Sequence, residues 1–317
     1  MLTYTLFVIG FIFLIKGADY LVDGSSSLAS RAGISQLVIG LTIVSFGTSA
    51  PELLVNIVAS LKGASDIGIG NILGSNIANI FLILGVAAAI YPLRIQKSTT
   101  WKEIPLNFLS AIVLLVLAND IFLDGAETSI LSHIDGLILM FFFIIFVYYT
   151  VGLAKAEKNH TDGYKKYGIP RSIIMILVGI VGLAYGGKWV VDGAVDVASR
   201  FGVSEALIGL TIVAVGTSLP ELATSAVAAM KRNADIAIGN VVGSNLFNVF
   251  WVLGLSAVIK PLPFRPEINT DILVYLVATI LLFLFAFTGK KEHVSRVDGW
   301  IFLSCYAAYI VFLVYRG

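Results

Sequence analysis

Two long segments of this chain repeat each other without a gap, and this repeat constrains the fold more than any other feature. The aligned pairs are 22–54, VDGSSSLASRAGISQLVIGLTIVSFGTSAPELL, with 191–223, VDGAVDVASRFGVSEALIGLTIVAVGTSLPELA, and 66–85, DIGIGNILGSNIANIFLILG, with 235–254, DIAIGNVVGSNLFNVFWVLG. The spacing is constant, because Glu221 follows Glu52 by 169 positions and Asn240 follows Asn71 by 169. About half of the aligned positions are identical, which is more than shared hydrophobicity produces. The chain therefore contains two copies of one structural unit.

Each copy is too apolar for a soluble domain. The chain is 58% hydrophobic and 13% charged, whereas soluble domains carry about 25% charged residues. Runs of about 20 apolar residues recur, each long enough to cross about 30 Å of hydrocarbon as a helix. Hydropathy predicts an all-α integral membrane protein with about ten transmembrane helices. The expected spans are 3–27, 34–61, 66–90, 104–119, 133–154, 172–197, 203–230, 235–259, 270–289 and 298–315.

The two copies are expected to cross the membrane in opposite directions. The predicted units are a first five-helix repeat at 1–153, a linker at 154–171 and a second five-helix repeat at 172–317. Because five is odd, the second repeat starts from the other side, which gives the inverted repeat found in many secondary transporters. Lys and Arg number roughly 14 on the linker side against about 5 on the other side, so the linker is predicted to be cytoplasmic. The expectation is a multi-pass plasma-membrane protein with both termini extracytoplasmic.

Several functional classes are disfavoured by residue content. The formal net charge of +1 does not provide the basic face that nucleic-acid binding needs. The single Cys305 has no partner for a disulfide, and neither a CxxC motif nor a Cys/His cluster suggests zinc. No buried Ser–His pair is expected for an intramembrane enzyme, since His133, His160 and His293 fall in loops or at span ends. We expect no cofactor and no obligatory protein partner; the lipid bilayer is the expected surrounding.

Each repeat carries a proline and a carboxylate at membrane depth, in GTSAPE (47–52) and GTSLPE (216–221). Proline has no N–H and clashes with the carbonyl four residues earlier, so Pro51 is expected to free the Gly47 carbonyl. Glu52 follows Thr48 by four positions, which places carboxylate and hydroxyl on one helix face. Such oxygen clusters suit hard cations. The second copy offers the same groups from Gly216, Thr217 and Glu221.

A second polar motif follows in each copy. In GNILGSNIAN, residues Asn71, Ser75 and Asn79 fall at i, i+4 and i+8, which predicts a polar stripe on an otherwise apolar helix. The equivalent residues of the second copy are Asn240, Ser244 and Asn248. These stripes are equally consistent with hydrogen bonds that join helices. If a pseudo-two-fold axis relates the copies, both stripes and both glutamates can converge on one point.

A cation site is the favoured interpretation of these motifs. A proline kink alone often means only a bend. A buried carboxylate costs about 2.5–3.5 kcal/mol even on the lenient insertion scale, and two occur at equivalent repeat positions. Other charges within spans are expected to snorkel or to form local ion pairs, as for Lys16 near Asp19 and Lys188 near Asp192.

The pairs GTSAPE/GTSLPE and GNILGSN/GNVVGSN, in two inverted halves, resemble the alpha repeats of sodium/calcium exchangers in the cation/calcium antiporter superfamily. The resemblance covers nearly the whole chain. It is to the prokaryotic type without a regulatory domain, since only 154–171 separates the halves. It implies an antiporter of Ca²⁺ and Na⁺. The ligands it implies are Glu52 and Glu221 at the centre with Thr48 and Thr217, flanking sodium sites at Ser49, Ser75, Ser218 and Ser244 with backbone carbonyls near Ser45 and Ala214, and Asn79 and Asn248 completing the cluster.

Alternatives remain open at this point. Proton/calcium exchangers of the superfamily normally carry a glutamate in a GNxxE pattern, whereas this chain continues GN with ILGSN and VVGSN, which favours sodium. Some members carry an aspartate at the position of Asn248, where an acid is associated with potassium dependence; asparagine argues against potassium. A Ca²⁺/H⁺ exchanger is the runner-up. A cation channel is disfavoured by the inverted repeat and by the absence of an evident four-fold filter segment.

Overall fold

The computed structural model describes residues 2–156, 167–201, 214–287 and 292–316. Its uninterrupted long helices are α1 (Leu2–Ala32), α7 (Ile104–Leu117), α9 (His133–Ala156), α10 (Ile169–Arg200), α16 (Asn269–Phe285) and α17 (Arg296–Arg316). The central helices change geometry along their length. In the first half they are α2 (Gln36–Ile39), η1 (Gly40–Val44), α3 (Ser45–Thr48), α4 (Ala50–Lys62), α5 (Ser65–Ala78), η2 (Asn79–Leu84) and α6 (Gly85–Ile90). In the second half they are α12 (Ala214–Thr217), α13 (Leu219–Met230), α14 (Ala234–Leu246), η5 (Phe247–Leu253) and α15 (Gly254–Ile259).

The helical membrane fold is confirmed. Among the described residues, eight helices are long and apolar enough to cross a membrane, and Gln36–Thr48 with Ala50–Lys62 makes one further span, bent by 47°. The predicted span 203–230 falls partly on residues 202–213, which lie outside the described residues; its described part is α12 and α13. Residues 157–166 of the predicted linker also lie outside the described part.

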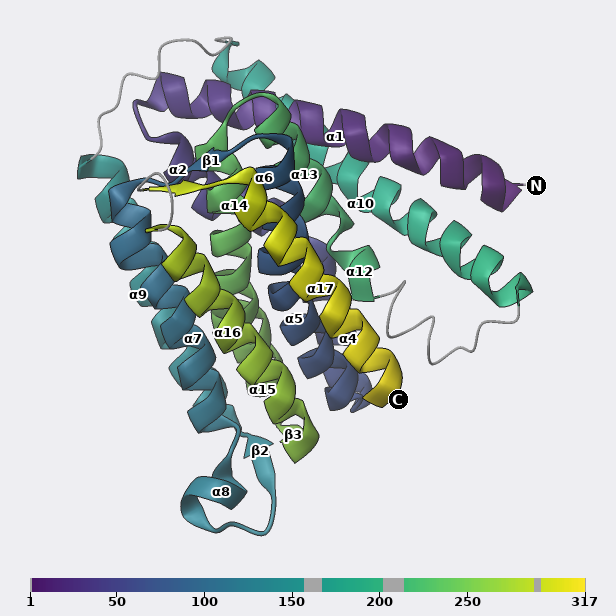
Figure 1. Ribbon diagram of the computed structural model, residues 1–317, viewed down its shortest axis with the longest axis vertical. Coiled ribbons are helices and arrows are strands. Elements are labelled where there is room, and N and C mark those ends of the chain that lie inside the picture. The colour runs from purple at the N-terminus through teal and green to yellow at the C-terminus, as the bar shows by residue number, and fades with distance from the viewer. Residues whose placement is uncertain (1, 157–166, 202–213, 288–291, 317) are drawn as a thin grey trace.

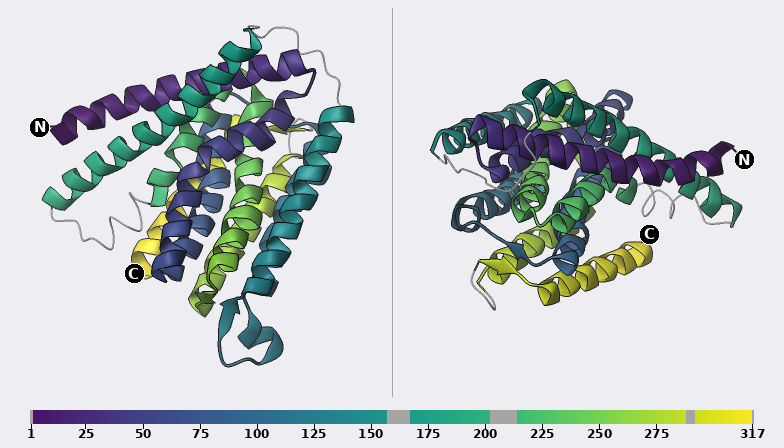
Figure 2. Two further views of the ribbon diagram at one scale, coloured as in Figure 1. Left: turned by 180° about the vertical axis from the view of Figure 1, so that it is seen from behind. Right: turned by 90° about the horizontal axis from the view of Figure 1, so that it is seen from above.

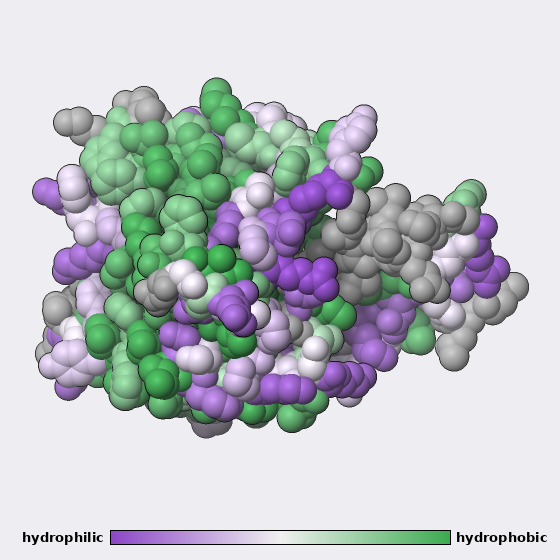
Figure 3. Space-filling model, turned by 90° about the horizontal axis from the view of Figure 1, so that it is seen from below, coloured by the Kyte–Doolittle hydropathy of each residue, from purple (hydrophilic) through white to green (hydrophobic). Residues whose placement is uncertain are grey.

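The central helices are enclosed by the others. The spans Asp66–Ile90 and Ala234–Ile259 are the most buried, and they occupy the middle of the bundle in Figures 1 and 2. Helices α7, α9, α16 and α17 cover one side, and α1 with α10 lies obliquely along another. Figure 3 looks onto one end of the bundle, where hydrophilic side chains gather between hydrophobic ones. The two central spans are therefore shielded on both sides.

Two short strand pairs join the halves reciprocally. Strand β1 (Leu93–Arg94) pairs with β4 (His293–Val294), and β2 (Ser129–Leu131) pairs with β3 (Leu262–Phe264), both antiparallel. The remaining short elements are η3 (Thr99–Glu103), α8 (Asp120–Asp124) and η6 (Pro266–Ile268). Each strand pair takes one strand from each repeat, as a pseudo-two-fold relation requires.

The fifth helix of each repeat begins with the same cap. Asp135 Oδ2 accepts a hydrogen bond from the Ser132 amide at 2.7 Å, and Asp298 Oδ2 accepts one from the Ser295 amide at 2.7 Å. Such side chains satisfy amides that have no partner within the helix. The structural repeat therefore extends to α9 and α17, beyond the two aligned segments.

Among the described elements, helices α1 and α10 form the most extensive contact. They contain 31 and 32 residues, or about 46 Å each, so they fit a hydrocarbon layer of about 30 Å only when tilted. Glycines let their backbones approach. A Cβ on Gly17 would lie 2.9 Å from the Gly179 carbonyl oxygen, and a Cβ on Gly10 would lie 2.9 Å from the Gly186 oxygen. Because Gly10 corresponds to Gly179 and Gly17 to Gly186, this contact also obeys the repeat.

Candidate cation site

The two glutamates lie at the first turns of α4 and α13, directly after the helix breaks. Each break has one non-helical serine, with φ −84° and ψ 9° at Ser49 and φ −87° and ψ 5° at Ser218. The proline two positions later cannot donate to the carbonyl four residues before it, which explains why both helices restart here. Glu52 and Glu221 are each 1% exposed. The sequence pattern thus produces two buried carboxylates at matching helix starts.

Serines link the carboxylate of each repeat to the opposite repeat. Ser49 Oγ donates to Glu221 Oε1 at 2.8 Å and lies 2.9 Å from Ser244 Oγ. In the other copy, Ser218 Oγ donates to Ser75 Oγ at 3.1 Å, and Ser75 Oγ donates to Glu52 Oε1 at 3.4 Å. Three of these four contacts join residues from different halves. The motifs of the two repeats are therefore in direct contact, while their convergence on one cation site stays a prediction.

The threonines of the motifs bind the polar stripes of the opposite repeat. Thr48 Oγ1 donates to Asn240 Oδ1 at 3.0 Å, and Thr217 Oγ1 donates to Asn71 Oδ1 at 3.2 Å. The amide of Asn240 in turn donates to Ser225 Oγ at 3.0 Å. These contacts fix the orientation of each threonine next to its helix break.

Asn76 and Asn245, which were not among the predicted site residues, form hydrogen bonds between the two halves. Asn76 Nδ2 donates to the Asn245 carbonyl at 3.2 Å, and Asn245 Nδ2 donates to the Asn76 carbonyl at 3.3 Å. Asn79 Nδ2 donates to Asn245 Oδ1 at 2.8 Å, and Asn248 Nδ2 donates to Asn76 Oδ1 at 3.1 Å. A count of residues at i, i+4 and i+8 does not include this pair, because each asparagine directly follows the serine of its stripe. Their identity in both copies, as GSN, was the available signal.

The remaining oxygens of the cluster suit a hard cation. Glu52 Oε2, Glu221 Oε2, Asn79 Oδ1 and Asn248 Oδ1 are buried and have no hydrogen-bond partner among the described residues. Buried acceptors in native proteins normally have a partner, and oxygen is the ligand that Ca²⁺ and Na⁺ prefer. Because both asparagines use their nitrogen for the partner repeat, their amide oxygens are the atoms left to bind a cation.

π-Helical turns occur where the stripes reach this cluster. Segment η2 begins at Asn79, and η5 includes Asn248 as its second residue. Such turns shift side chains relative to a regular helix and are frequent at functional sites. They begin at or next to these asparagines, directly after the regular helices that carry the rest of each stripe.

Two predicted ligands are less engaged with the cluster. Ser45 Oγ donates to the Leu41 carbonyl at 2.8 Å, and the Ser45 carbonyl accepts from the Ser49 amide at 3.0 Å. Ala214 is the first residue of α12. Their role through backbone carbonyls stays a prediction.

The two intramembrane lysines differ in their ion pairs. Lys188 pairs with Asp192 at 3.5 Å, whereas no ion pair of Lys16 is found among the described residues.

The chain matches a known family over both repeats. Residues 2–152 and 171–315 match the family described as "Sodium/calcium exchanger protein". The chain belongs to this family. Similar proteins include sodium/calcium exchanger MaX1 of Methanosarcina acetivorans, 32% identical over 98% of both chains, and inner membrane protein YrbG of Escherichia coli, 37% identical over 95% of both. A solved structure of the sodium-calcium exchanger NCX_Mj superposes with a TM-score of 0.84 at 34% identity, over 98% of both chains. The resemblance inferred from the motifs is confirmed.

Proposed function

We propose that this protein exchanges Ca²⁺ for Na⁺ across the plasma membrane by alternating access, with both cations competing for the cluster around Glu52 and Glu221. The observation that carries the proposal is that both buried carboxylates are linked through serines to the opposite repeat, Glu221 directly to Ser49 and Glu52 through Ser75 to Ser218. Membership of the sodium/calcium exchanger family supports the choice of ions. Proteins similar to this chain over their whole length bear the same description.

Competition between the ions follows from charge. Two carboxylates neutralise one Ca²⁺, or hold more than one Na⁺, but they do not serve both loads at once. An unloaded site with two negative charges is costly to seal from water, because burying an uncompensated charge costs several kcal/mol. We infer that the site closes only when it is loaded, which couples the two fluxes.

The side chains have distinct parts in this scheme. Glu52 and Glu221 supply the charge, and Asn79 and Asn248 add neutral oxygens without increasing it. Ser49, Ser75, Ser218 and Ser244, with Thr48 and Thr217, supply hydroxyl oxygens around the carboxylates. Exchange of ligands among neutral hydroxyls and amides requires no proton transfer, which suits rapid release.

Helices α1 and α10 are the candidate moving elements. Helix α10 contacts both breaks: a Cβ on Gly47 would lie 2.6 Å from Ile180 Cδ1, and a Cβ on Gly216 would lie 2.2 Å from Val191 Cγ2. A displacement of the α1–α10 pair along the bundle would therefore change access to both halves of the site. Their glycine-lined contact lets the two helices move as one body.

The test is calcium uptake into proteoliposomes that contain the purified protein. An outward sodium gradient should drive uptake of radioactive calcium, and dissipation of that gradient should stop it. Uptake driven equally by a proton gradient in the absence of sodium would replace the sodium assignment with Ca²⁺/H⁺ exchange. Unitary currents in planar bilayers without counter-transport would indicate a channel instead.

A further inference from the structure

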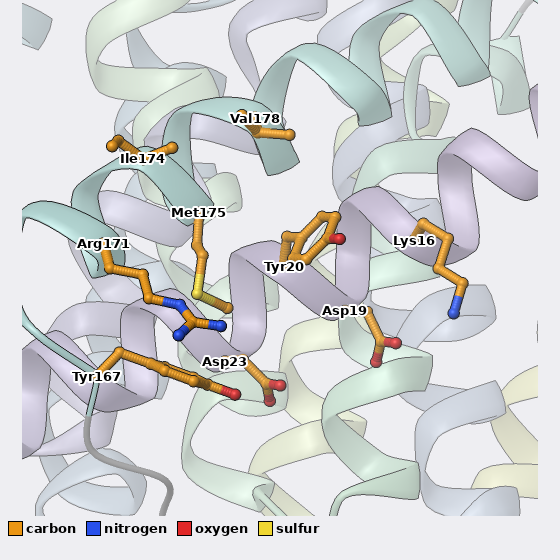
Figure 4. A pocket seen from close by; sticks show the side chains of 9 residues that line it. All are labelled: Lys16, Asp19, Tyr20, Asp23, Tyr167, Arg171, Ile174, Met175 and Val178. Atoms are coloured by element: carbon orange, nitrogen blue, oxygen red, sulfur yellow. The ribbon is translucent and has the colours of Figure 1, made fainter.

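A polar pocket outside the cation site lies between α1 and the beginning of α10. Its volume is about 520 Å³, and Figure 4 shows its side chains. Lys16 lies at one end, Arg171 with Tyr167 at the other, and Asp19 and Asp23 project from α1 between them. No part of the proposed exchange chemistry uses these residues.

An apolar groove adjoins this pocket along the same two helices. Its volume is about 460 Å³, and it shares Lys16, Tyr20 and Val178 with the polar pocket. Leu177 and Val181 form part of its wall and are 58% and 54% exposed. Because α1 and α10 are membrane-length helices, this groove faces the hydrocarbon of the bilayer. The polar pocket is thus continuous with an apolar groove that faces the lipid.

The four charged side chains that line the polar pocket sum to zero, but Lys231, which lies outside the lining, binds both carboxylates and offsets one of their two charges. Lys231 Nζ binds Asp19 Oδ1 at 2.8 Å and Asp23 Oδ1 at 2.6 Å, so these three side chains carry one net negative charge. Within the described ranges, neither Lys16 nor Arg171 has a carboxylate at ion-pair distance, and the Arg171 guanidinium lies 4.6 Å from the centre of the Tyr167 ring. The whole group therefore carries a net charge of +1.

We propose that the pocket and the groove together bind one singly anionic glycerophospholipid of the phosphatidylglycerol class. Its phosphate lies between Arg171 and Lys16, and one acyl chain fills the apolar groove. The headgroup hydroxyls donate to Asp19 and Asp23, which still have acceptor capacity beside Lys231. A lipid phosphate also compensates the charge of Lys16, whose side chain is exposed on a helix long enough to cross the hydrocarbon layer.

This assignment does not depend on which ions the protein exchanges, so it is tested by lipid binding alone. The full chain in detergent is titrated with 1-palmitoyl-2-oleoyl phosphatidylglycerol, and native mass spectrometry gives the Kd of the first bound lipid. Lys16→Gln and Arg171→Gln should each weaken this Kd roughly fivefold or more, since one cation near an anionic lipid contributes about that factor. Lys97→Gln, which removes an exposed cation lining a different hollow, is the matched control and should leave Kd unchanged.

The groove is tested by filling it. Val181→Trp should weaken phosphatidylglycerol binding, whereas Val8→Trp, at a site on α1 that is 60% exposed and outside the groove wall, should not. Wild-type affinity in both cation variants overturns the proposal. Equal affinity for phosphatidylcholine also overturns it, because the anionic charge would then be irrelevant. So does competition by sn-glycerol 3-phosphate at the same concentration as the lipid, because the acyl chain would then be irrelevant.

Discussion

At the scale of single residues, we expect the carboxylate charge to be the property of Glu52 and Glu221 that exchange requires. Glutamine keeps the shape and one oxygen but removes the charge. We expect Glu52→Gln and Glu221→Gln each to lower sodium-driven calcium uptake roughly 100-fold, as loss of about 3 kcal/mol of cation binding would do. Thermal unfolding should change little.

A third buried glutamate provides the matched control for those variants. Glu103 is 0% exposed and accepts a hydrogen bond from the Tyr149 hydroxyl, but it lies on η3, away from the serine cluster. Glu103→Gln should keep the wild-type rate. Equal loss in all three variants would mean that burial, and not the convergence of the two motifs, explains the effect.

The asparagine pair between the halves, Asn76 and Asn245, is expected to affect both stability and ion affinity. Asn76→Ala removes the acceptor of Asn248 Nδ2 and the donor to the Asn245 carbonyl. Each orphaned buried group costs about 1–3 kcal/mol. We expect a lower melting temperature and a higher sodium concentration for half-maximal exchange.

Asn119 separates these two effects. It forms a reciprocal amide pair with Asn269, at 2.8 and 2.6 Å, away from the cation cluster. Asn119→Ala should lower the melting temperature without shifting the sodium dependence. If both variants shift the sodium dependence equally, the Asn76 pair has no special role in the site.

At the scale of helices, the break before each glutamate positions the carboxylate. Pro51→Ala supplies an N–H to the Gly47 carbonyl and lets α3 continue into α4, which would reduce the 47° bend. We expect a roughly tenfold or larger loss of exchange with unchanged or higher thermal stability. Pro105→Ala, near the start of α7 and outside both motifs, is the control and should retain exchange. Wild-type exchange in Pro51→Ala would show that the bend is dispensable.

The local elements were only partly predictable from the sequence. The positions of both helix breaks were predicted from the prolines of the two motifs, because a proline interrupts a helix whatever its neighbours are. The π-helical turns at Asn79 and Asn248 were not predicted, because counting residues at helical spacing assumes a regular α-helix. Asn76 was not predicted for the same reason, since it lies outside the regular stripe and its partner lies in the other repeat.

At the scale of the whole molecule, the repeat predicted more than any single motif. A constant spacing of 169 residues placed Glu52 and Glu221 in equivalent positions. An odd number of spans in each copy implied that the two copies cross the membrane in opposite directions. The reciprocal strand pairs, the asparagine pair and the α1–α10 contact all follow that symmetry. The ion pairs of the two repeats depart from this symmetry and were not predicted by it. Lys231 links α13 to Asp19 and Asp23 of α1, whereas Lys188 pairs within α10.

The orientation of the molecule in the membrane is the prediction that belongs to this largest scale. The excess of Lys and Arg on the linker side predicts a cytoplasmic linker and extracytoplasmic termini. Since Cys305 is the only cysteine, Cys305→Ser provides a background in which single cysteines report their side. With a membrane-impermeant maleimide, Lys62→Cys and Glu127→Cys should react in intact cells, and Lys97→Cys and Lys155→Cys only after permeabilisation. The reverse pattern would invert the molecule, and labelling of Lys62→Cys and Lys97→Cys from the same side would contradict the odd number of spans that makes the two repeats antiparallel.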